Sequence, residues 1–420
     1  MPHSNPMQLK IESLAHGGLG LARHEGVVFV PYVVPGETVE AEIIEQKKGY
    51  AFARLVEVLE PSPFRVTPPC PVYGICGGCH LQHIAHDAQV EFKQAILKET
   101  FRRMAALDVN PGPALVGAPF GYRHRATFKV SPKGEIGFFG PKSNTIISMG
   151  KCLLLADGLN SLLAALRKNS DLLKSVSEIE TASGLDGITL FIRSGGLSKE
   201  RLTTLMKVLP GVIGIQDGKS RAVGNAAVSF NVCGLPFRIT AGNFFQANQE
   251  LNETLVEAVL AALAPLEGKT VLDAYAGAGN FTLPLAKGAG RVVAVEGNAA
   301  AVEDARENAK AAGLTNCPVL SGAIENVRLS GRFDAAVLDP PRAGLSPAII
   351  QKLLDLKPET IVYVACDPAT LTRDVRRLSS IYTLAQVRLA DMFPQTYHME
   401  TLTLLTCNKS KCKGLQDKAL

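Results

Sequence analysis

Residues 361–368 read Ile-Val-Tyr-Val-Ala-Cys-Asp-Pro, and this stretch indicates the fold class of the 420-residue chain. A continuous apolar run that stops at a proline is typical of a strand buried in a parallel sheet. Ligands of open α/β sheets bind at the carboxyl ends of the strands, so the Cys366 thiol is predicted to face a site. A second strand, 335–338, runs into Asp-Pro-Pro-Arg at 339–342. We therefore expect Cys366 and Asp339 to share one active site.

The chain after residue 254 alternates regularly between helix and strand patterns. Helices are expected over 250–264 and 299–312, and strands over 271–273, 292–296, 317–320, 335–339 and 361–366. This alternation predicts parallel strands joined by helices, and therefore an α/β fold with a doubly wound sheet. A closing hairpin is expected from 387–389 and 401–405.

The first 60 residues follow another pattern, in which short strands such as 26–31 and 37–43 are separated by Gly and Pro. Close turns of this kind predict a small β-barrel. Basic and aromatic residues lie together at Lys47, Lys48, Tyr50, Phe52 and Arg54. They suit a barrel that binds oligonucleotides, and a solvated hairpin would explain them equally well.

The chain length and the positions of Gly and Pro residues predict three domains. The barrel is expected over 1–61, a central mixed α+β domain over 62–235, a catalytic domain over 236–410 and a tail over 411–420. A helix over about 85–107 belongs to the central domain by position and can pack on the catalytic domain.

Composition describes a globular chain with 46% hydrophobic and 20% charged residues. A formal charge of +5 permits a nucleic-acid partner where positive groups cluster. The amino terminus has no apolar signal core, and the longest apolar helical stretch, 255–266, is too short to cross a membrane. We expect a cytoplasmic protein without membrane contact. In that reducing compartment, the 9 cysteines favour metal binding or catalysis over disulfides.

A glycine loop at 273–281, Asp-Ala-Tyr-Ala-Gly-Ala-Gly-Asn-Phe, lies between a strand and a helix. Its glycines let the backbone turn tightly and approach a ligand, but the third glycine of the dinucleotide fingerprint is missing. Glu296 ends the next strand and can accept hydrogen bonds from ribose hydroxyls, in a nicotinamide site or an S-adenosylmethionine site. The Asp-Pro-Pro-Arg strand end at 339–342 favours methyl transfer to a planar ring over nicotinamide-dependent oxidoreduction.

In combination, these motifs resemble the RNA 5-methyluridine methyltransferases that use S-adenosylmethionine. The resemblance covers nearly the whole chain: a TRAM-like barrel, a cysteine cluster, and the motifs at 122–125, 243–248, 273–281, 339–342, 365–368 and 391–400. It implies a class I Rossmann-like methyltransferase domain, an N-terminal TRAM or OB-like barrel, and a central iron–sulfur domain.

The resemblance also implies roles for single residues. Cys366 is expected to be the nucleophile that adds to carbon 6 of uracil, and Glu400 the base that removes the proton from carbon 5. The residues expected to bind S-adenosylmethionine are Gln246, Tyr275, Asn280, Glu296 and Asp339. Ala323 stands where a polar residue commonly contacts the adenine, so backbone groups or Glu325 must serve instead.

A free thiol titrates at about 8.5, so a reactive Cys366 needs its surroundings to favour the thiolate. The nearby sequence offers two candidate cations for this purpose, Arg342 and Arg373.

The cysteines Cys70-x5-Cys76-x2-Cys79 lie on a glycine-containing loop, and the resemblance points to Cys152 as a fourth ligand. Four thiolates suit a [4Fe–4S] cluster or zinc, and we prefer a structural cluster. His80, His83 and His86 offer a zinc alternative. A non-catalytic iron–sulfur RNA-binding redox sensor is the rival function.

Three basic residues, Arg123, Arg125 and Lys129, are expected to contact RNA phosphates. The target uridine must leave its stack to reach Cys366, which favours a single strand or loop. Within the family, the barrel and the cluster together are common in ribosomal RNA enzymes, so the resemblance favours 23S rRNA over tRNA. We expect a monomer.

Overall fold

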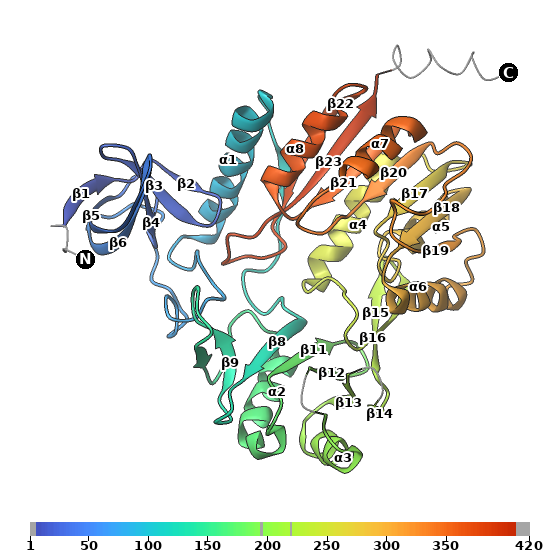
Figure 1. Ribbon diagram of the computed structural model, residues 1–420, viewed down its shortest axis with the longest axis horizontal. Coiled ribbons are helices and arrows are strands. Elements are labelled where there is room, and N and C mark those ends of the chain that lie inside the picture. Colours follow the sequence, from blue (N-terminus) through green and yellow to red (C-terminus); the bar gives the residue numbers. More distant parts are fainter. Residues whose placement is uncertain (1–5, 194–195, 219–220, 409–420) are drawn as a thin grey trace.

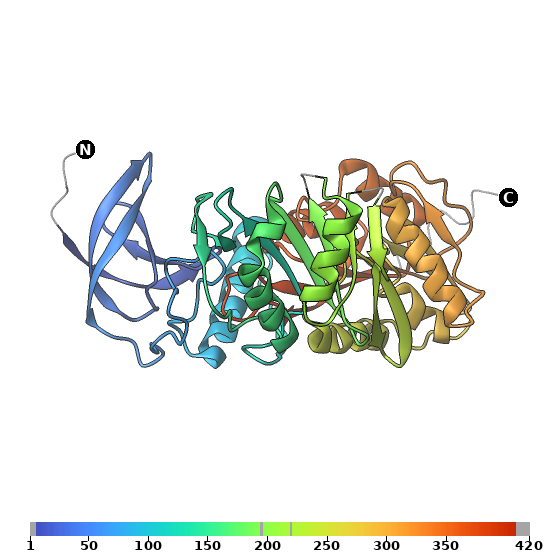
Figure 2. The same cartoon turned by 90° about the horizontal axis from the view of Figure 1, so that it is seen from below.

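The computed structural model describes residues 6–193, 196–218 and 221–408, so the expected tail over 411–420 lies outside the described residues. An N-terminal six-stranded sheet with the order β1-β5-β6-β4-β3-β2 forms a barrel-like unit at one end of the molecule (Figures 1 and 2). Its strands are β1 (Met7–Lys10), β2 (Ser13–Ala15), β3 (Leu19–Arg23), β4 (Val27–Pro31), β5 (Thr38–Lys47) and β6 (Tyr50–Glu60). Alternate residues such as Val28, Val30 and Ala53 point inward and form its core.

The central part is a seven-stranded sheet with the order β10-β9-β8-β11-β12-β13-β14. Its strands are β8 (Arg125–Val130), β9 (Ile136–Phe139), β10 (Ile146–Ser148), β11 (Glu178–Ser183), β12 (Ile188–Arg193), β13 (Val212–Asp217) and β14 (Arg221–Gly224). Helices α2 (Asp157–Lys168) and α3 (Lys199–Val208) and a 3-10 turn at Ser170–Leu173 accompany it. Leucines spaced along α2 share a core with β8 and β11.

The part of the chain that is expected to be catalytic contains an eight-stranded sheet with the order β19-β18-β17-β20-β21-β23-β22-β7. Its strands are β17 (Thr270–Ala274), β18 (Arg291–Glu296), β19 (Val319–Ser321), β20 (Ala335–Leu338), β21 (Thr360–Ala365), β22 (Tyr382–Ala390), β23 (Glu400–Cys407) and β7 (Gly112–Leu115). Strands β17 to β21 are parallel, and β23 is antiparallel to both of its neighbours. The expected doubly wound sheet and closing hairpin are therefore confirmed.

Helices cover both faces of this sheet, and the strand order reverses between β17 and β20. The helices are α4 (Gln249–Leu263), α5 (Thr282–Gly288), α6 (Ala299–Ala311), α7 (Pro347–Leu356) and α8 (Pro368–Leu378). A hairpin of β15 (Ala227–Val232) and β16 (Leu235–Thr240) precedes them, so the boundary expected after residue 235 falls inside β16. None of the helices in the described ranges is both long and apolar enough to cross a membrane.

Helix α1 (His86–Ala105) and β7 precede the central sheet in sequence but pack with the catalytic part. Figure 1 shows α1 beside α8. Leu97 and Phe101 of α1 share a core with Tyr363 and Leu378, so the helix packs against the eight-stranded sheet and α8. The pairing of β7 with β22 was not expected, because Gly-Pro-Ala-Leu at 112–115 has little strand propensity.

Replacing Phe101 by Ala should loosen α1 from the catalytic sheet, because the ring is fully buried. We expect a loss of about 3–5 kcal/mol of unfolding free energy. Met104→Ala on the same helix, where the side chain is 41% exposed, should cost about 0.5 kcal/mol or less. Urea unfolding curves of the two variants provide the measurement, and equal stability would contradict the observed packing of α1.

Candidate active site

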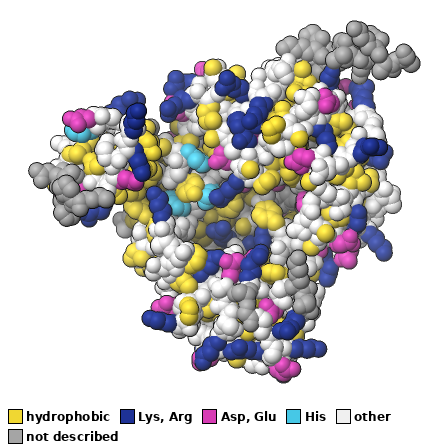
Figure 3. All heavy atoms as spheres, viewed as in Figure 1, with side chains coloured by type: hydrophobic (Ala, Val, Ile, Leu, Met, Phe, Trp, Pro, Cys, Tyr) yellow, Lys and Arg dark blue, Asp and Glu magenta, His cyan; other side chains and the backbone are white. Residues whose placement is uncertain are grey.

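A cavity of about 840 Å³ opens at the carboxyl ends of β17, β18, β20 and β21. The reversal of strand order between β17 and β20 opens the sheet edge there, as is usual for ligand sites in doubly wound sheets. Figure 3 shows a hollow on this face with histidine side chains at its edge. All seven residues expected to bind the methyl donor or to react line the cavity: Gln246, Tyr275, Asn280, Glu296, Asp339, Cys366 and Glu400.

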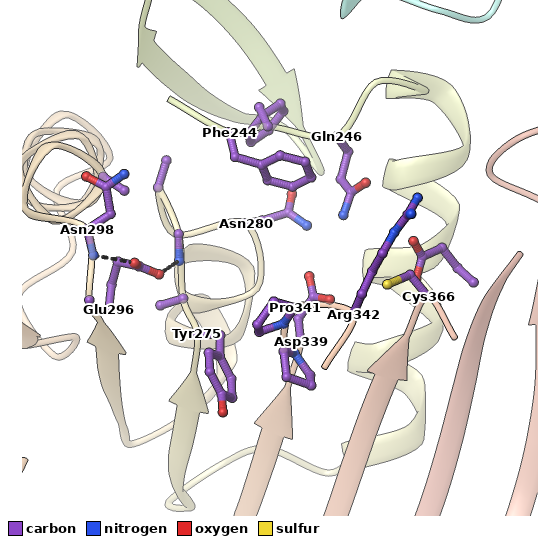
Figure 4. Close-up of a pocket in the computed structure, with 18 of the residues that line it drawn as sticks. Phe244, Gln246, Tyr275, Asn280, Glu296, Asn298, Asp339, Pro341, Arg342 and Cys366 are labelled. Atoms are coloured by element: carbon purple, nitrogen blue, oxygen red, sulfur yellow. Dashed lines mark hydrogen bonds between the residues drawn. The ribbon is translucent and has the colours of Figure 1, made fainter. Parts of the chain in front are cut away.

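The glycine loop after β17 is held in its tight conformation by Glu296. One carboxylate oxygen of Glu296 accepts the Gly277 N–H at 2.9 Å, and the other accepts the Asn298 N–H at 2.6 Å (Figure 4). Gly279 has a φ of +97°, and a Cβ there would lie 2.4 Å from the Leu283 side chain, so this position requires glycine. Each oxygen of Glu296 keeps acceptor capacity that a ribose hydroxyl could use.

Asn280 is positioned by a residue that the sequence analysis missed. Its side-chain amide exchanges two hydrogen bonds with the Asn252 amide of α4, at 2.8 and 3.0 Å. Asn252 is completely buried, and a polar residue on the otherwise apolar inner face of a helix is the signal that could have identified it. The pair leaves Asn280 one free N–H and one free lone pair for a ligand.

Gln246 follows β16 on a segment that α6 holds in place. The buried Asp304 of α6 accepts hydrogen bonds from the Thr240 backbone and the Asn243 side chain. In Figure 4, Gln246 and Asn280 both point into the space above Asp339.

One end of the cavity is apolar, with Val295, Ala301, Ala323 and Ile324 in its lining. Such a slot fits a purine ring, and Ala323 supplies no polar contact to it. Glu325 also lines the cavity and accepts a hydrogen bond from the Ser346 hydroxyl at 3.0 Å. Together with Glu296 and the glycine loop, these residues fit the nucleoside of S-adenosylmethionine.

Strand register brings Cys366 and Glu400 together at the other end of the cavity. Ala365 of β21 pairs with Thr401 of β23, so the next residue on one strand and the preceding residue on the other lie side by side. Glu400 is only 7% exposed. Asp339 and Arg342 follow the adjacent strand β20 and line the same end.

The acidic groups at this end lie close together and are largely buried, which raises their pKa values. Burial, with the neighbouring Glu400, raises the pKa of the Cys366 thiol to about 11. Burial raises the pKa of Asp339 to about 7 and that of Glu400 well above its ordinary value. The positive charge of Arg342 acts in the opposite direction on Cys366 and Glu400.

Of the two arginines proposed to favour the thiolate, Arg342 is the one placed to do so. Arg373 instead pairs with the buried Asp374 at 2.9 Å and donates to the Ala343 carbonyl at 2.8 Å. It therefore holds the loop after β20 and does not line the cavity.

The four cysteines expected to bind a metal centre line a separate small cavity of about 50 Å³. Cys70, Cys76, Cys79 and Cys152 meet there with apolar neighbours that include Phe138 and Met149. Burial raises the pKa of Cys76, of Cys79 (to about 12) and of Cys152. In the described part of the chain, no three His, Cys, Asp or Glu side chains already form a metal-binding group.

The three histidines do not take part in this cysteine cavity. Both ring nitrogens of His83 are engaged, one with the Tyr73 hydroxyl at 2.6 Å and the other with the Val33 carbonyl at 3.1 Å. His80 packs on Tyr397, and His86 lies 3.7 Å from Asp391. The alternative prediction, a zinc site formed by these histidines, was therefore wrong, because each histidine has different partners.

The three basic residues expected to contact phosphates differ in their surroundings. Lys129 pairs with Glu178, and the Arg125 guanidinium lies over the Phe244 ring and 3.8 Å from Glu180. Arg123 lines both cavities, and its buried Nε makes no hydrogen bond within the described ranges. Among the three, Arg123 is therefore the best placed to receive an anionic group.

Comparisons with known proteins agree with this site. Residues 228–408 match the family described as tRNA (Uracil-5-)-methyltransferase, and residues 7–56 match the TRAM domain. The 23S rRNA (uracil(1939)-C(5))-methyltransferase RlmD of Shewanella sp. (strain ANA-3) is 37% identical over 97% of each chain. RlmD of Shewanella amazonensis (strain ATCC BAA-1098 / SB2B) is 35% identical over 96% of each chain.

A solved structure agrees along nearly the whole chain. The crystal structure of Pyrococcus abyssi tRNA (uracil-54, C5)-methyltransferase in complex with S-adenosyl-L-homocysteine superposes with a TM-score of 0.77 and 26% sequence identity. It covers 95% of this chain and 100% of the Pyrococcus chain. The chain therefore belongs to the family of S-adenosylmethionine-dependent RNA (uracil-C5)-methyltransferases.

Proposed function

We propose that this enzyme methylates carbon 5 of a uridine in 23S rRNA and that Cys366 forms a transient covalent bond to the base. The observation that carries this proposal is the register of β21 and β23, which places a thiol beside a buried carboxyl group at the methyl-donor cavity. The similarity to the RlmD enzymes over 96–97% of the chain supports 23S rRNA over tRNA. An RNA substrate agrees with the expected cytoplasmic location, and the monomeric state remains a prediction.

The residues divide the chemistry between them. The Cys366 thiolate adds to carbon 6 of uracil, and the electrons of the 5,6 double bond move toward O4, which makes carbon 5 nucleophilic. S-adenosylmethionine, when bound, would supply the electrophilic methyl group of its sulfonium to carbon 5 and would leave as neutral S-adenosylhomocysteine. Glu400 then removes the proton from carbon 5, the double bond re-forms and the Cys366 thiolate leaves.

Arg342 by itself does not bring the pKa of Cys366 into the neutral range. Another positive charge in the cavity would favour the ionised forms of Cys366, Asp339 and Glu400 together. We infer that a cationic ligand beside these groups lowers their pKa values and promotes thiolate formation. The site would thus keep its thiol protonated until the methyl donor is present.

We further propose that Cys70, Cys76, Cys79 and Cys152 hold a [4Fe–4S] cluster. Apart from Tyr73, Gln82 and Arg123, the rest of their cavity is lined by apolar residues, and no carboxylate lies among the described residues that line it. Thiolates without carboxylates are a donor set that suits soft metal ions. Burying several thiols is costly when they ionise, and a metal centre would balance that charge. Zinc remains the alternative occupant for four thiolates.

Cys366→Ala should abolish methylation, because the covalent bond to carbon 6 cannot form. Glu400→Gln should form this bond and resolve it slowly, so an RNA–protein adduct should accumulate on a denaturing gel. Cys233→Ala, which lies outside both cavities, is the control. Methylation assays on 23S rRNA fragments and on tRNA fragments show which of the two RNAs is the substrate. Normal turnover by Cys366→Ala would contradict the mechanism, and methylation of tRNA alone would favour the alternative substrate.

Alkylation of Cys366 by iodoacetamide should depend on the charge of the bound ligand. In the ligand-free enzyme the rate should rise with pH and level off near the Cys366 pKa of about 11, because only the thiolate reacts. Sinefungin carries a positive amine near the place of the sulfonium, whereas S-adenosylhomocysteine is neutral there. Sinefungin should lower the apparent pKa by about one unit or more relative to S-adenosylhomocysteine. Peptide mass spectrometry measures the rates, and equal pH profiles would contradict the inference.

Anaerobically purified protein should be brown and contain about four irons and four sulfides per chain. Cys152→Ser should lose most of this iron, because it removes one of four thiolate ligands. Cys317→Ser, at a buried cysteine outside the small cavity, should retain it. Metal analysis and the visible absorption spectrum distinguish the cluster from zinc. A colourless protein with one zinc per chain would contradict the cluster.

A further inference from the structure

Helix α1 carries a lysine that is buried against the loop between β22 and β23. Lys93 is 1% exposed, and its ammonium group donates to the Asp391 carboxylate at 2.6 Å, where Asp391 is 0% exposed. The same ammonium group donates to the backbone carbonyls of Phe393 at 3.3 Å and His398 at 3.0 Å. One side chain of α1 thus binds the loop at three points along its length.

A second buried side chain, one helical turn earlier, binds the middle of the same loop. Gln89 is 0% exposed; its N–H group donates to the Gln395 side-chain oxygen, and its own oxygen accepts the Gln395 backbone N–H, both at 3.0 Å. Residues four apart lie on one face of a helix, so Gln89 and Lys93 act on the loop from the same side.

The loop needs such support because its own conformation is irregular. The ends of this nine-residue loop are fixed where Ala390 pairs with Glu400, but residues 391–399 form no helix or strand. Gln395, at its centre, has a φ of +69°, which is unfavourable for a residue with a side chain.

The loop forms a wall at the reactive end of the catalytic cavity. Phe393, Thr396 and His398 line that cavity together with Cys366 and Glu400. The His398 ring lies 3.5 Å from the Arg342 guanidinium, the cation that acts on both reactive groups. A displaced loop would therefore hydrate Cys366 and Glu400 and would free Arg342 to move.

Filling this space with a buried ion pair is unfavourable in desolvation free energy, so stability alone does not explain the pair. Two buried charges lose their hydration, and a pair of apolar side chains of similar volume is often as stable or more so. Apolar side chains could not hold the carbonyls of Phe393 and His398, however. The additional hydrogen bonds indicate that Lys93 fixes the position of the loop as well as packing against it.

We propose that Lys93 and Gln89 are positioning residues that hold the β22–β23 loop as a fixed wall over Cys366 and Glu400. They touch no reacting atom and act through the loop. The inference rests on the proposed roles of Cys366 and Glu400 in the reaction. The donor end of the cavity, around Glu296 and Asn280, is built by other elements and should not depend on them.

The test is the double variant Lys93→Met/Asp391→Asn, which removes both charges so that neither is left buried alone. Its methylation kcat should fall about 10- to 100-fold, while S-adenosylhomocysteine affinity stays within about threefold. Alkylation of Cys366 at pH 8 should become faster by about tenfold, because hydration of the thiol lowers its pKa by about one unit. Lys98→Met, at a half-exposed lysine of the same helix, is the control for both readouts.

A general loss of stability would lower methylation and ligand affinity together and would accelerate alkylation of the buried Cys317 as well as of Cys366, so that pattern would overturn the inference. Unchanged methylation and alkylation would also overturn it. If the double variant does not fold, Gln89→Leu provides the same two readouts. Alkylation does not require Cys366 to be catalytic, so normal turnover by Cys366→Ala would refute the proposed function separately from the result on the loop.

Discussion

The register of three adjacent strands, β20, β21 and β23, determines where the chemistry can occur. Leu338 pairs with Tyr363 and Ala365 pairs with Thr401. Asp339, Cys366 and Glu400 consequently leave the sheet at one edge, although they are separated along the chain by up to about sixty residues. A shift of one residue in either pairing would turn alternate side chains to the opposite face and separate the thiol from the carboxyl group.

The second constraint is electrostatic, because the same sheet edge brings the acidic groups of Asp339, Cys366 and Glu400 together in a poorly hydrated space. Burial raises the pKa values of Asp339, Cys366 and Glu400, and the positive charge of Arg342 opposes this shift for Cys366 and Glu400. The loop of Arg342 is anchored by α8, where the buried Asp374 accepts the Leu345 backbone N–H at 2.8 Å. We therefore expect the proposed reactivity of Cys366 to depend on a cation whose loop is held by α8.

The residues at strand ends could be predicted from sequence. Apolar runs mark buried strands, and the polar residue that ends each run must lie at the sheet edge, which identified Asp339, Glu296 and Cys366. The resemblance to a methyltransferase family added Glu400 and Gln246, which local patterns do not mark, and the cavity contains both.

Contacts between distant segments could not be predicted in this way. The strand β7 has little strand propensity, and its place in the sheet depends on its pairing with β22. Asn252 positions its partner Asn280, which lies on the glycine loop. Lys93 holds a loop that lies some 300 residues later in the chain. The choice between Arg342 and Arg373 depended on which arginine Asp374 engages.

The central claim is that Cys366 bonds to the uracil ring during methyl transfer. RNA carrying 5-fluorouridine at the target position tests it most directly. Carbon 5 then carries fluorine in place of the proton that the base must remove, so the adduct should persist. In the presence of S-adenosylmethionine, we predict a stable complex with the mass of protein plus RNA plus one CH2 unit, because a methyl group is gained and the thiol proton is lost. The link should lie on the peptide that contains Cys366. Absence of a complex, or a link to any other residue, would contradict the account.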